Sequence, residues 1–450
     1  MKQTVDYKYL NFVQFSSIDS WSIYAILGKG LVYTNKYPFV EIGKFLKRNK
    51  TQVEIQNGVI YKRPTIKINA KGITLRDEVD GINIGTKNQF RIKEGQFLLS
   101  KIDARNGAFG VVPKELDNGI ITGNFWTFDV DYSKINPVYL MLLTGTKEFQ
   151  KLSQSASVGT TNRNYLQEKL FLNFKIPLPS LAEQEAIVKA YQTKIQQAQD
   201  LEQQAQNLEQ EIEKYFLNEL GLEPYKSKEK IRGLMTIDFQ DLERWDYFSS
   251  DIMINQEINK SKFPLVKIGS VFSFVKRSFN KNKYKKETFE YIEIGAIDPI
   301  KGILKSKKVL ASKAPSRATQ YIKSNDLIIG TTRPYLKKFA IVTDKHDNSV
   351  CSSGFSVIEE SNNYFLPYLL QFLKCTYGIE QLKNKMTGGL YPAITEGELK
   401  EIKIPFPNVA KQKEIMSLVK KKEKEIKDNI LKNIQLKHQA EQEFEQALFN

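Results

Sequence analysis

The sequence predicts two similar α/β (α+β) units in tandem, each followed by a long polar helix. The main observation is a segment that occurs twice, as IPLPSLAEQ at Ile176–Gln184 and as IPFPNVAKQ at Ile404–Gln412. Two prolines separated by one residue keep the backbone extended and stop any preceding helix. Each copy is followed by a long polar run with helical spacing of its apolar residues, and the segments before the two copies also correspond in order.

The first repeated segment opens a helix that we expect to run to about Leu220. Ser180 and Glu183 have the spacing of a capping box at a helix start. The apolar residues then recur at steps of three and four, as in the seam of a coiled coil. They are Ala198, Leu201, Ala205, Leu208, Ile212 and Tyr215.

The second repeated segment opens a helix that reaches the C-terminus, with a less regular apolar stripe and a lysine-rich flank at 420–425. The stripe consists of Ile415, Val419, Ile426, Ile430 and Ile434. From the residues alone, the two helices could pair antiparallel within the chain, either could pair between chains, or they could be unrelated surface helices.

Composition limits the class of protein. A chain of 450 residues exceeds the ~250–300 at which a single core stops growing, so two or more domains are expected. No apolar run approaches the ~20 residues of a membrane span, and the N-terminus lacks the apolar region of a signal peptide, so we expect a cytoplasmic protein with no membrane association. Two cysteines, Cys351 and Cys375, are too few for a disulfide framework or a cysteine zinc site. His346 and His438 are far apart, so no metal site is expected.

The charge favours a polyanionic partner. Lysine plus arginine number 67 against 51 acidic residues, a net charge of +16, and nucleic acid is the leading candidate. Abundant Lys, Asn and Ile could partly reflect AT-rich coding DNA, but the basic residues crowd one stretch with Phe279, Tyr284 and Tyr291 between them, which favours a basic surface. They are Lys276, Arg277, Lys281, Lys283, Lys285, Lys286, Lys301, Lys305, Lys307, Lys308, Lys313, Arg317 and Lys323.

The two units begin in the same way. Phe15–Trp21 is echoed by Phe239–Trp245, and Val40–Lys44 by Val266–Ser270, each a short strand or helix start. Residues 50–112 have alternating apolar residues cut by glycines, which predicts strands.

A strand that runs into a basic turn follows in both units. The strands are Gln96–Ser100 and Asp326–Gly330, and the turns are Lys101–Gly107 and Thr331–Lys338. These turns are the first candidates for contact with a ligand.

Each unit then has a helix started by proline, at Pro137–Leu143 and Pro367–Leu373, where the missing N–H of proline costs nothing. A Gly/Thr turn follows, at Gly159–Arg163 and Thr387–Tyr391. Its N–H groups and hydroxyls can hold phosphate, although an ordinary loop is the alternative for either turn alone.

The expected organisation is a duplicated one. Its parts are a first unit at 1–179, a long helix at 180–220, a linker at 221–238, a second unit at 239–407 and a second long helix at 408–450. For a DNA-binding protein, two similar units imply two half-sites at a fixed spacing.

Catalytic motifs are incomplete. Asn136–Tyr139 lacks the second proline of an amino-methyltransferase motif and reads better as a helix start. Gly28–Gly30 lacks the third glycine of a dinucleotide fingerprint, and no phosphate-binding Gly-Lys-Ser/Thr occurs. Glu401–Lys403 resembles the end of a nuclease motif, but no convincing aspartate precedes it.

The chain resembles, over about 15 to 450, the specificity subunit of type I restriction–modification systems. The resemblance is carried by Lys175–Pro179 with Gln184, by Lys403–Pro407 with Gln412, and by Arg244–Asp246. The chain departs from the pattern at Lys411, which stands where Glu183 stands in the first copy, and at Ser20 before Trp21.

The resemblance implies a non-enzymatic subunit with two target-recognition domains, each reading one half of a split sequence of double-stranded DNA. The long helices would form an antiparallel coiled coil, which would set the spacing and carry two modification (methyltransferase) subunits. A helix of ~40 residues spans ~60 Å, and half-sites one turn apart lie ~34 Å apart. No cofactor is expected in this chain, because the methyltransferase would bring S-adenosylmethionine and the restriction subunits ATP and Mg²⁺.

Arginine can bridge O6 and N7 of guanine, and asparagine can bridge N6 and N7 of adenine. The two basic turns are therefore expected to read bases. Lys276, Arg277 and Lys283 are expected to hold phosphates. The full set of expected DNA contacts is Lys101, Arg105, Asn106, Thr160, Thr161, Arg163, Lys276, Arg277, Lys283, Thr331, Arg333, Tyr335, Lys337, Lys338 and Tyr391. The alternatives are a self-contained DNA-modifying enzyme and a coiled-coil scaffold whose positive charge is incidental.

Overall fold

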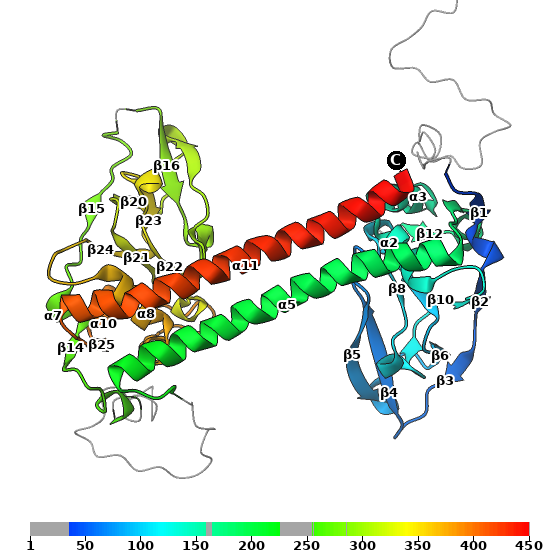
Figure 1. Cartoon of the computed structure of the whole chain (residues 1–450), viewed down its shortest axis with the longest axis horizontal. Coiled ribbons are helices and arrows are strands. Elements are labelled where there is room, and N and C mark those ends of the chain that lie inside the picture. Colours follow the sequence, from blue (N-terminus) through cyan, green and yellow to red (C-terminus); the bar gives the residue numbers. More distant parts are fainter. Residues whose placement is uncertain (1–35, 159–163, 226–253, 255, 285, 450) are drawn as a thin grey trace, which may run out of the picture. The chain divides into compact units, whose positions relative to one another are not determined.

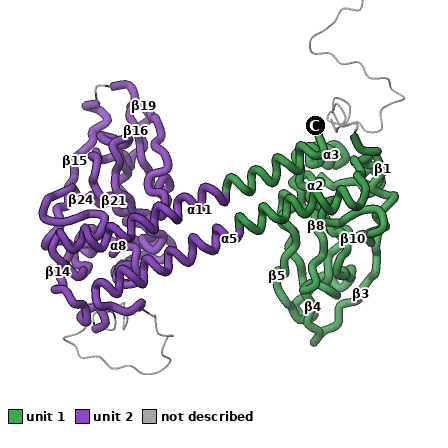
Figure 2. The backbone as a smooth tube through the Cα atoms, in the orientation of Figure 1, with its two compact units in different colours: residues 1–198, 434–450 green, residues 199–433 purple. Residues whose placement is uncertain are grey.

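The computed structural model describes residues 36–158, 164–225, 254, 256–284 and 286–449. Several expected features lie outside these ranges: Phe15–Trp21, Gly28–Gly30, Gly159–Arg163, Phe239–Trp245 with Asp246, and the expected linker from Lys226 onward. The chain divides into two compact units (Figure 2), residues 1–198 with 434–450 and residues 199–433. The long helices α5 (Leu181–Leu220) and α11 (Val409–Phe449), drawn in Figure 1, each contribute to both units, as the colours of Figure 2 show.

Unit 1 contains small antiparallel sheets, a four-stranded one in the order β2-β10-β7-β8, a three-stranded one in the order β3-β6-β9, and the hairpin β4-β5. Its strands are β1 (Phe39–Glu41), β2 (Leu46–Asn49), β3 (Gln52–Glu54), β4 (Ile60–Ile66), β5 (Ile73–Asp80), β6 (Asn88–Arg91), β7 (Phe97–Ser100), β8 (Phe109–Val111), β9 (Ile120–Ile121), β10 (Phe125–Val130), β11 (Ser157–Val158), β12 (Tyr165–Leu166) and β13 (Lys175–Pro177). Its shorter helices are α2 (Pro137–Gly145), α3 (Lys147–Ser155) and α4 (Glu168–Leu172).

Unit 2 has the same arrangement of strands as unit 1 in the later part of its sequence, and a different sheet in the earlier part. The sheet β22-β21-β24 corresponds to β8-β7-β10, whereas the five-stranded sheet β15-β20-β23-β16-β19 includes a parallel pair, β16 with β23. Its strands are β14 (Leu265–Lys267), β15 (Arg277–Ser278), β16 (Thr288–Ile292), β17 (Ile297–Asp298), β18 (Gly302–Ile303), β19 (Lys307–Leu310), β20 (Ala318–Tyr321), β21 (Leu327–Gly330), β22 (Phe339–Ile341), β23 (Val350–Ser352), β24 (Phe355–Ile358) and β25 (Lys403–Pro405). Its shorter helices are α7 (Ile268–Val271), α8 (Leu366–Lys374), α9 (Thr376–Asn384) and α10 (Glu396–Lys400).

The glutamine of the repeated segment explains why that segment occurs twice. Gln184 is fully buried; its amide donates to the carbonyl of the second proline at 2.9 Å and its oxygen accepts the N–H of Asn136 at 2.8 Å. Gln412, also fully buried, makes the same two bonds, at 2.8 Å to the second proline and at 2.9 Å from the N–H of Phe365. One side chain thus joins the start of each long helix to the start of the preceding helix, α2 or α8.

A tyrosine completes this arrangement in both units. The hydroxyls of Tyr139 and Tyr368 donate to the carbonyl of the first proline, at 2.8 and 2.6 Å. The first proline of each segment, Pro177 or Pro405, is the last residue of β13 or β25. These strands pair antiparallel with β1 and β14. The expected duplication is therefore confirmed down to individual hydrogen bonds.

The expected helix starts are also confirmed. Ser180 and Glu183 form a capping box, in which the Glu183 carboxylate accepts the Ser180 N–H at 3.0 Å. The hydrogen bonds from Ser180 lower the pKa of Glu183. In the second copy the Asn408 side chain accepts the N–H of Lys411 at 2.9 Å, so the cap is kept without the glutamate.

The long helices pair antiparallel. In unit 2, Lys422 lies 2.5 Å from Glu211 and Lys411 lies 2.9 Å from Glu219, so residue numbers rise along α5 as they fall along α11. In unit 1 the pairing is between Lys194 and Glu443, whose charged groups are 3.1 Å apart. Of the arrangements that the sequence leaves open, the structure shows the one within the chain.

The expected apolar stripe is right for α5 and partly wrong for α11. Ala198, Ala205 and Ile212 are buried, but Ile434 is 50% exposed. The buried positions of α11 after Ile426 are instead Asn429, Asn433, Ala440, Phe444 and Leu448. The buried positions of α11 keep steps of three and four near these two asparagines, but asparagine is polar. A pattern of apolar residues therefore does not include them.

Candidate nucleic-acid interface

In both units the central strand of a three-strand motif ends at a turn that the sequence predicts to contact DNA. β7 lies between β8 and β10, and β21 lies between β22 and β24. The N–H of Lys101 donates to Asn124 at 2.9 Å, and the N–H of Thr331 donates to Gly354 at 2.9 Å. The two turns therefore occupy the same place on two copies of one scaffold.

The turn of unit 2 has an unusual backbone. Arg333 and Lys337 both have positive φ, +49° and +54°, on either side of the single turn Pro334–Leu336. The left-handed conformation costs a residue with a side chain about 1–2 kcal/mol, and it persists here because Arg333 donates its N–H to Pro392 and Lys337 donates to Pro334, both at 2.8 Å. Strained backbone of this kind is characteristic of functional loops.

Arg333 lies under an exposed loop. Its guanidinium carbon is 5.0 Å from the centre of the Tyr391 ring, and its Nη2 donates to the carbonyl of Leu390 at 3.2 Å. Tyr391 is 67% exposed and Leu390 is 80% exposed. A cation over an aromatic ring contributes about 0.5–1 kcal/mol at an exposed site, so Arg333 helps to hold both residues in place.

Three other candidates lie on the same turn. Tyr335 is exposed, whereas Thr331 and Lys338 are half-buried. The Thr331 hydroxyl donates to Gly354 at 3.0 Å, and the Lys338 ammonium donates to Ile297 at 2.5 Å. Part of the hydrogen-bonding capacity of these two side chains is therefore used within the protein.

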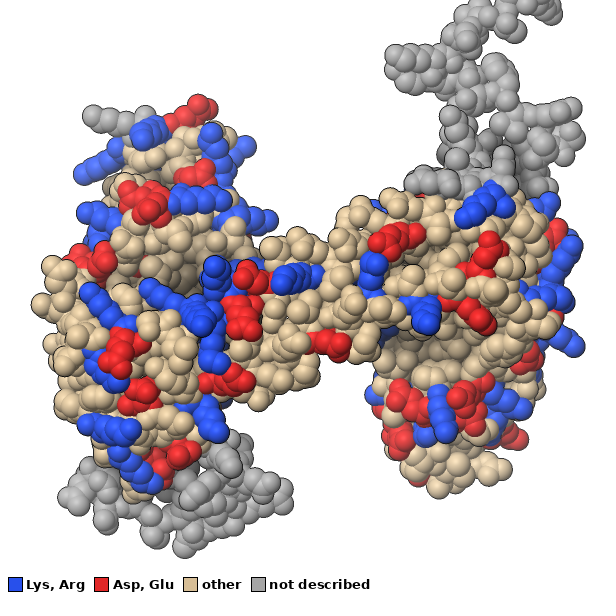
Figure 3. All heavy atoms as spheres, in the orientation of Figure 1, with Lys and Arg blue, Asp and Glu red and all other residues tan. Residues whose placement is uncertain are grey.

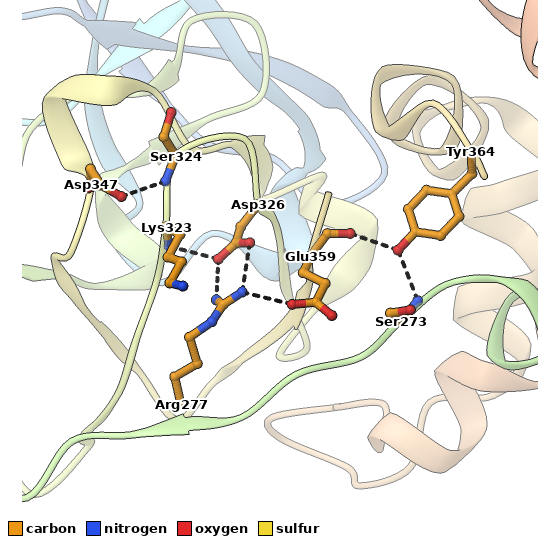
Figure 4. A network of polar contacts seen from close by, with 8 residues as sticks. All are labelled: Ser273, Arg277, Lys323, Ser324, Asp326, Asp347, Glu359 and Tyr364. Carbon is orange, nitrogen blue, oxygen red and sulfur yellow. Dashed lines mark hydrogen bonds and ion pairs between the residues drawn. The ribbon is translucent and has the colours of Figure 1, made fainter. Parts of the chain in front are cut away.

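Arg277 is engaged in an ion pair (Figure 4). Its Nη1 and Nη2 lie 2.5 and 3.2 Å from the two carboxylate oxygens of Asp326, and Nη2 lies 3.3 Å from Glu359. Burial alone lowers the pKa of Arg277, but the hydrogen bonds and charges of Asp326 and Glu359 outweigh burial, and the pKa is raised overall. Asp326 is itself buried and also accepts the N–H of Lys323 at 2.7 Å. These contacts favour a structural role for Arg277.

The other basic residues of this stretch that the structure describes, including Lys276 and Lys283, are exposed, and Lys285 lies outside the described residues. On the face shown in Figure 3, Lys and Arg side chains are numerous over the end of unit 2 that carries β16 and β19. The aromatic residues between them have another role: Phe279 and Tyr291 are buried and pack with Phe289 in a small core. They support the basic surface and are not available for stacking on bases.

The turn of unit 1 combines a lysine with aromatic rings. The Lys101 ammonium lies 5.9 Å from the centres of both the Trp126 and the Tyr165 rings. Burial lowers the pKa of Lys101, and the positive charge of Arg48 lowers it further. A negatively charged group beside Lys101 would offset the repulsion between Lys101 and Arg48. The surroundings of Lys101 therefore favour an anionic ligand.

Arg48 is a residue of this site that the sequence did not reveal. It lies on β2, donates Nη1 to the carbonyls of Asn49 and Thr127 at 2.7 and 2.9 Å, and has its Nε 3.7 Å from Glu168. The Nε atom is buried without a hydrogen-bond partner, and burial lowers the pKa of the guanidinium. No motif surrounds Arg48 in the sequence, so only its contacts identify it.

Arg105 and Asn106 are the other candidates in the turn Lys101–Gly107. Asn106 is exposed; its amide donates to Asp103 at 3.3 Å, and its carbonyl accepts the N–H of Asn69 at 2.8 Å. Arg105 is half-buried. Thr160, Thr161 and Arg163 lie outside the described residues.

Within the described ranges, no group of three or more His, Cys, Asp or Glu residues is arranged to hold a metal ion. Glu401 of the nuclease-like segment instead pairs with Lys267 at 2.5 Å. Both cysteines are buried, and burial raises the pKa of each thiol to about 12, which disfavours the reactive thiolate. Across the same part of the chain, no helix is both long and apolar enough to cross a lipid bilayer.

Two solved structures were compared with this fold, and the first of them supports it. A chain from a structure described as "Structural basis underlying complex assembly and conformational transition of the type I R-M system" has a TM-score of 0.55 and 14% identity, over 92% of this chain and 98% of that one. The HsdS subunit from Thermoanaerobacter tengcongensis, also 14% identical, covers 93% of this chain and 97% of its own with a TM-score of 0.42.

Comparison of sequences gives the family. The specificity subunit of the type I restriction enzyme HindI from Haemophilus influenzae is 28% identical over 138 residues, which are 30% of this chain and 29% of that protein. The match therefore spans less than a third of that relative. The family model of the type I restriction modification DNA specificity domain matches twice, at residues 34–213 and 260–436. With both copies matched over most of its length, the chain belongs to the family of type I restriction–modification DNA specificity proteins.

Proposed function

We propose that this chain is the non-catalytic, sequence-reading subunit of a type I restriction–modification complex, acting on double-stranded DNA in the cytoplasm. In this proposal residues 1–179 and 239–407 are its two recognition domains, and each reads one half of a bipartite target. The membership of the family and the net charge of +16 support this role.

The observation that carries the proposal is that two copies of one scaffold present different side chains at the same place. Lys101 and Thr331 make equivalent backbone bonds at the ends of β7 and β21, yet one is a cation between aromatic rings and the other a hydroxyl. A scaffold that is duplicated with unlike reading faces suits an asymmetric target with two different halves.

The residue roles follow from exposure and contacts. We assign base contacts to the turns, through Lys101, Arg105 and Asn106 in unit 1 and through Thr331, Arg333, Tyr335, Lys337, Lys338 and Tyr391 in unit 2. Lys276 and Lys283, which are exposed on the basic surface, are assigned to phosphates. Arg277 is assigned to holding β15 against the start of β21.

We assign the paired helices α5 and α11 to the spacing of the two half-sites and to binding two methyltransferase subunits, through which restriction subunits join. S-adenosylmethionine would enter with the methyltransferase, and ATP and Mg²⁺ with the restriction subunits.

Purification of the chain from its native host, with identification of bound proteins by mass, tests these assignments. A methyltransferase in a two-to-one ratio is expected, and sequencing of methylated bases should then give one bipartite motif that disappears when the gene for this chain is deleted. Recovery of the chain without a methyltransferase would contradict the proposal. Methylation by the isolated chain would instead support a self-contained modifying enzyme.

DNA binding separates the proposal from a scaffold with incidental charge. Each phosphate contact lowers log K by about 0.9 per unit of log salt concentration. The proposal therefore predicts that affinity falls steeply as the salt concentration rises. It also predicts a preference for duplexes that contain the motif identified by methylation. A scaffold predicts weak binding with neither property.

A further inference from the structure

The loop under which Arg333 lies is short and closed at its base. Thr387 and Ala393 exchange two backbone hydrogen bonds, at 2.8 and 2.9 Å, and enclose the five residues Gly388–Pro392. Gly388 has φ of +96°, a conformation that residues with side chains rarely adopt. Pro392 restricts the other side of the loop. The loop therefore has a defined shape, and its end is formed by Leu390 and Tyr391.

This loop is joined to the strained turn of unit 2. The N–H of Arg333 donates to Pro392 at 2.8 Å, and the N–H of Ile394 donates to Thr331 at 2.9 Å. The turn contributes two more exposed apolar residues, Tyr335 and Leu336. Single exposed leucines are ordinary in proteins, but here four large apolar side chains lie exposed on two joined loops of the face assigned to DNA.

The charge around these loops favours a polyanion over a protein partner. Residues 327–343 and 381–395, which form the strand, the turn, the end of α9 and the loop, contain no Asp or Glu. Their charged residues are Arg333, Lys337, Lys338, Lys383 and Lys385. A positive face carrying an exposed apolar end matches proteins that insert a leucine or similar side chain between base pairs and so kink the duplex.

We propose that Leu390 inserts as a wedge at one base step in, or next to, the half-site read by unit 2, with Tyr391 behind it fixed by Arg333. This inference rests on the proposed DNA-reading function. It assigns to Arg333 the task of positioning the wedge through the Leu390 carbonyl and the Tyr391 ring. It also makes the step at the wedge a site of indirect readout, since steps that unstack easily cost less to deform.

The wedge belongs to one half-site only. The corresponding segment of the first half, Gly159–Arg163, has threonines and asparagine between its glycine and arginine and no large apolar side chain. The complex should therefore distort the two halves of its target unequally.

The test uses the complete complex and duplexes that contain the motif defined by methylation, with 2-aminopurine placed in turn at each adenine position of the motif and its flanks. Unstacking raises the fluorescence of this base. The methyltransferase subunits flip the bases that they methylate, so fluorescence at those positions is expected in both half-sites and does not report on the wedge. At the other positions, the wild-type complex should raise fluorescence at one step on the unit 2 side, and Leu390→Ala should remove most of that rise while weakening binding about tenfold. Leu390 is 80% exposed, so its truncation leaves the fold intact.

Leu304→Ala is the matched control, because Leu304 is a 50% exposed leucine of the same unit, between β18 and β19. It should leave the fluorescence pattern and the affinity unchanged. A second series carries a single abasic site at each step, which removes the cost of unstacking. Wild type should gain affinity at the wedge step, and Leu390→Ala should show no such gain.

The outcomes distinguish the inference from the function on which it rests. Specific binding without unstacking at any step other than the methylated bases, and with equal affinity for Leu390→Ala, would overturn the wedge and leave the proposed function standing. Absence of specific binding by the wild-type complex would instead reject the proposed function. Loss of the methyltransferase from Leu390→Ala, with DNA unstacking unchanged, would make the loop a protein contact and also overturn the wedge.

Discussion

The two recognition units share the buried polar contacts of the repeated segment and differ in the side chains at their turns. Gln184 and Gln412, like Tyr139 and Tyr368, make the same hydrogen bonds to the same backbone atoms of their segments. At the end of the central strand, however, one unit places a lysine against aromatic rings, and the other places an arginine under an exposed loop. Fold is thus specified by a few buried polar contacts, and binding by side chains that these contacts do not constrain.

The surroundings of the two turns differ as well. In unit 1 the residues after β4 cover the turn, because the N–H of Ala70 donates to Gly107 at 2.7 Å. A Cβ on Gly107 would lie 3.1 Å from the Asn69 backbone, and its φ is +72°, so glycine is required there. Unit 2 has Lys337 at the corresponding place, in the same left-handed conformation. The covered turn needs a glycine, whereas the turn of unit 2 can carry a lysine.

The largest expected effect breaks a contact that, among the described residues, is found in unit 2 and not in unit 1. Asp326→Asn leaves Arg277 without its main partner, and loss of one member of a buried pair costs about 3 kcal/mol. The free energy of unfolding should fall by that amount in a denaturant titration. Arg277→Ala should also destabilise, whereas the exposed neighbour Lys276→Ala should not. If Arg277→Ala lowers only DNA affinity, the phosphate role first expected for Arg277 is the correct one.

The next effect tests a contact that both units share. Gln184→Ala and Gln412→Ala each leave a part-buried backbone N–H, that of Asn136 or Phe365, without its acceptor, and each should destabilise its unit by about 2 kcal/mol. Gln203→Ala is the control, because that glutamine is exposed on α5 and bonds only to Asn207 among the described contacts. Hydrogen exchange in each unit measures the two losses of stability. If they are unequal, the two glutamines contribute differently to stability although their hydrogen bonds have the same geometry.

A third change addresses the difference in reading. Arg333→Ala should alter preference at base pairs in the half-site of unit 2, at a cost of about 1–3 kcal/mol at the affected position, and leave the other half-site unchanged. Binding to a set of duplexes with single substitutions measures this. Uniform loss across all duplexes would place Arg333 among the phosphate contacts, and no loss at all would remove it from the site.

The smallest effect concerns the basic surface. Lys283→Ala should weaken all DNA sequences alike, by less than about 1 kcal/mol, and should reduce the salt slope by about one contact. Lys421, exposed on α11, supplies a control lysine outside the recognition surface. A sequence-dependent loss for Lys283→Ala would show that this lysine reads bases.

Local patterns predicted much of this fold. The prolines, the capping box of Ser180 and the apolar spacing of α5 depend on neighbouring residues, and they place the helices correctly. The antiparallel pairing is beyond local patterns, because it depends on contacts such as that of Glu211 with Lys422. The buried Asn429 and Asn433 escaped notice because polarity, taken alone, indicates exposure.

The site was less predictable than the fold. The recurrence of a strand and a basic turn predicts a contact face in each unit, but the partners of each side chain come from distant segments. The sequence predicts a phosphate contact for Arg277, because its partner Asp326 is 49 residues away and no local pattern joins the two. Leu390 attracted no attention because an exposed leucine has no sequence signature, and its setting is visible only once the turn of Arg333 lies beside it.

The main-chain bonds that fix the reading turns also determine how freely this protein can evolve. Lys101 and Thr331 are attached through N–H and carbonyl groups, which every residue except proline possesses in full. A substitution of the exposed side chain therefore leaves the attachment intact. Under the proposed function, new sequence preferences can therefore arise one residue at a time without passing through an unfolded ancestor, and the two halves of the proposed target can diverge independently.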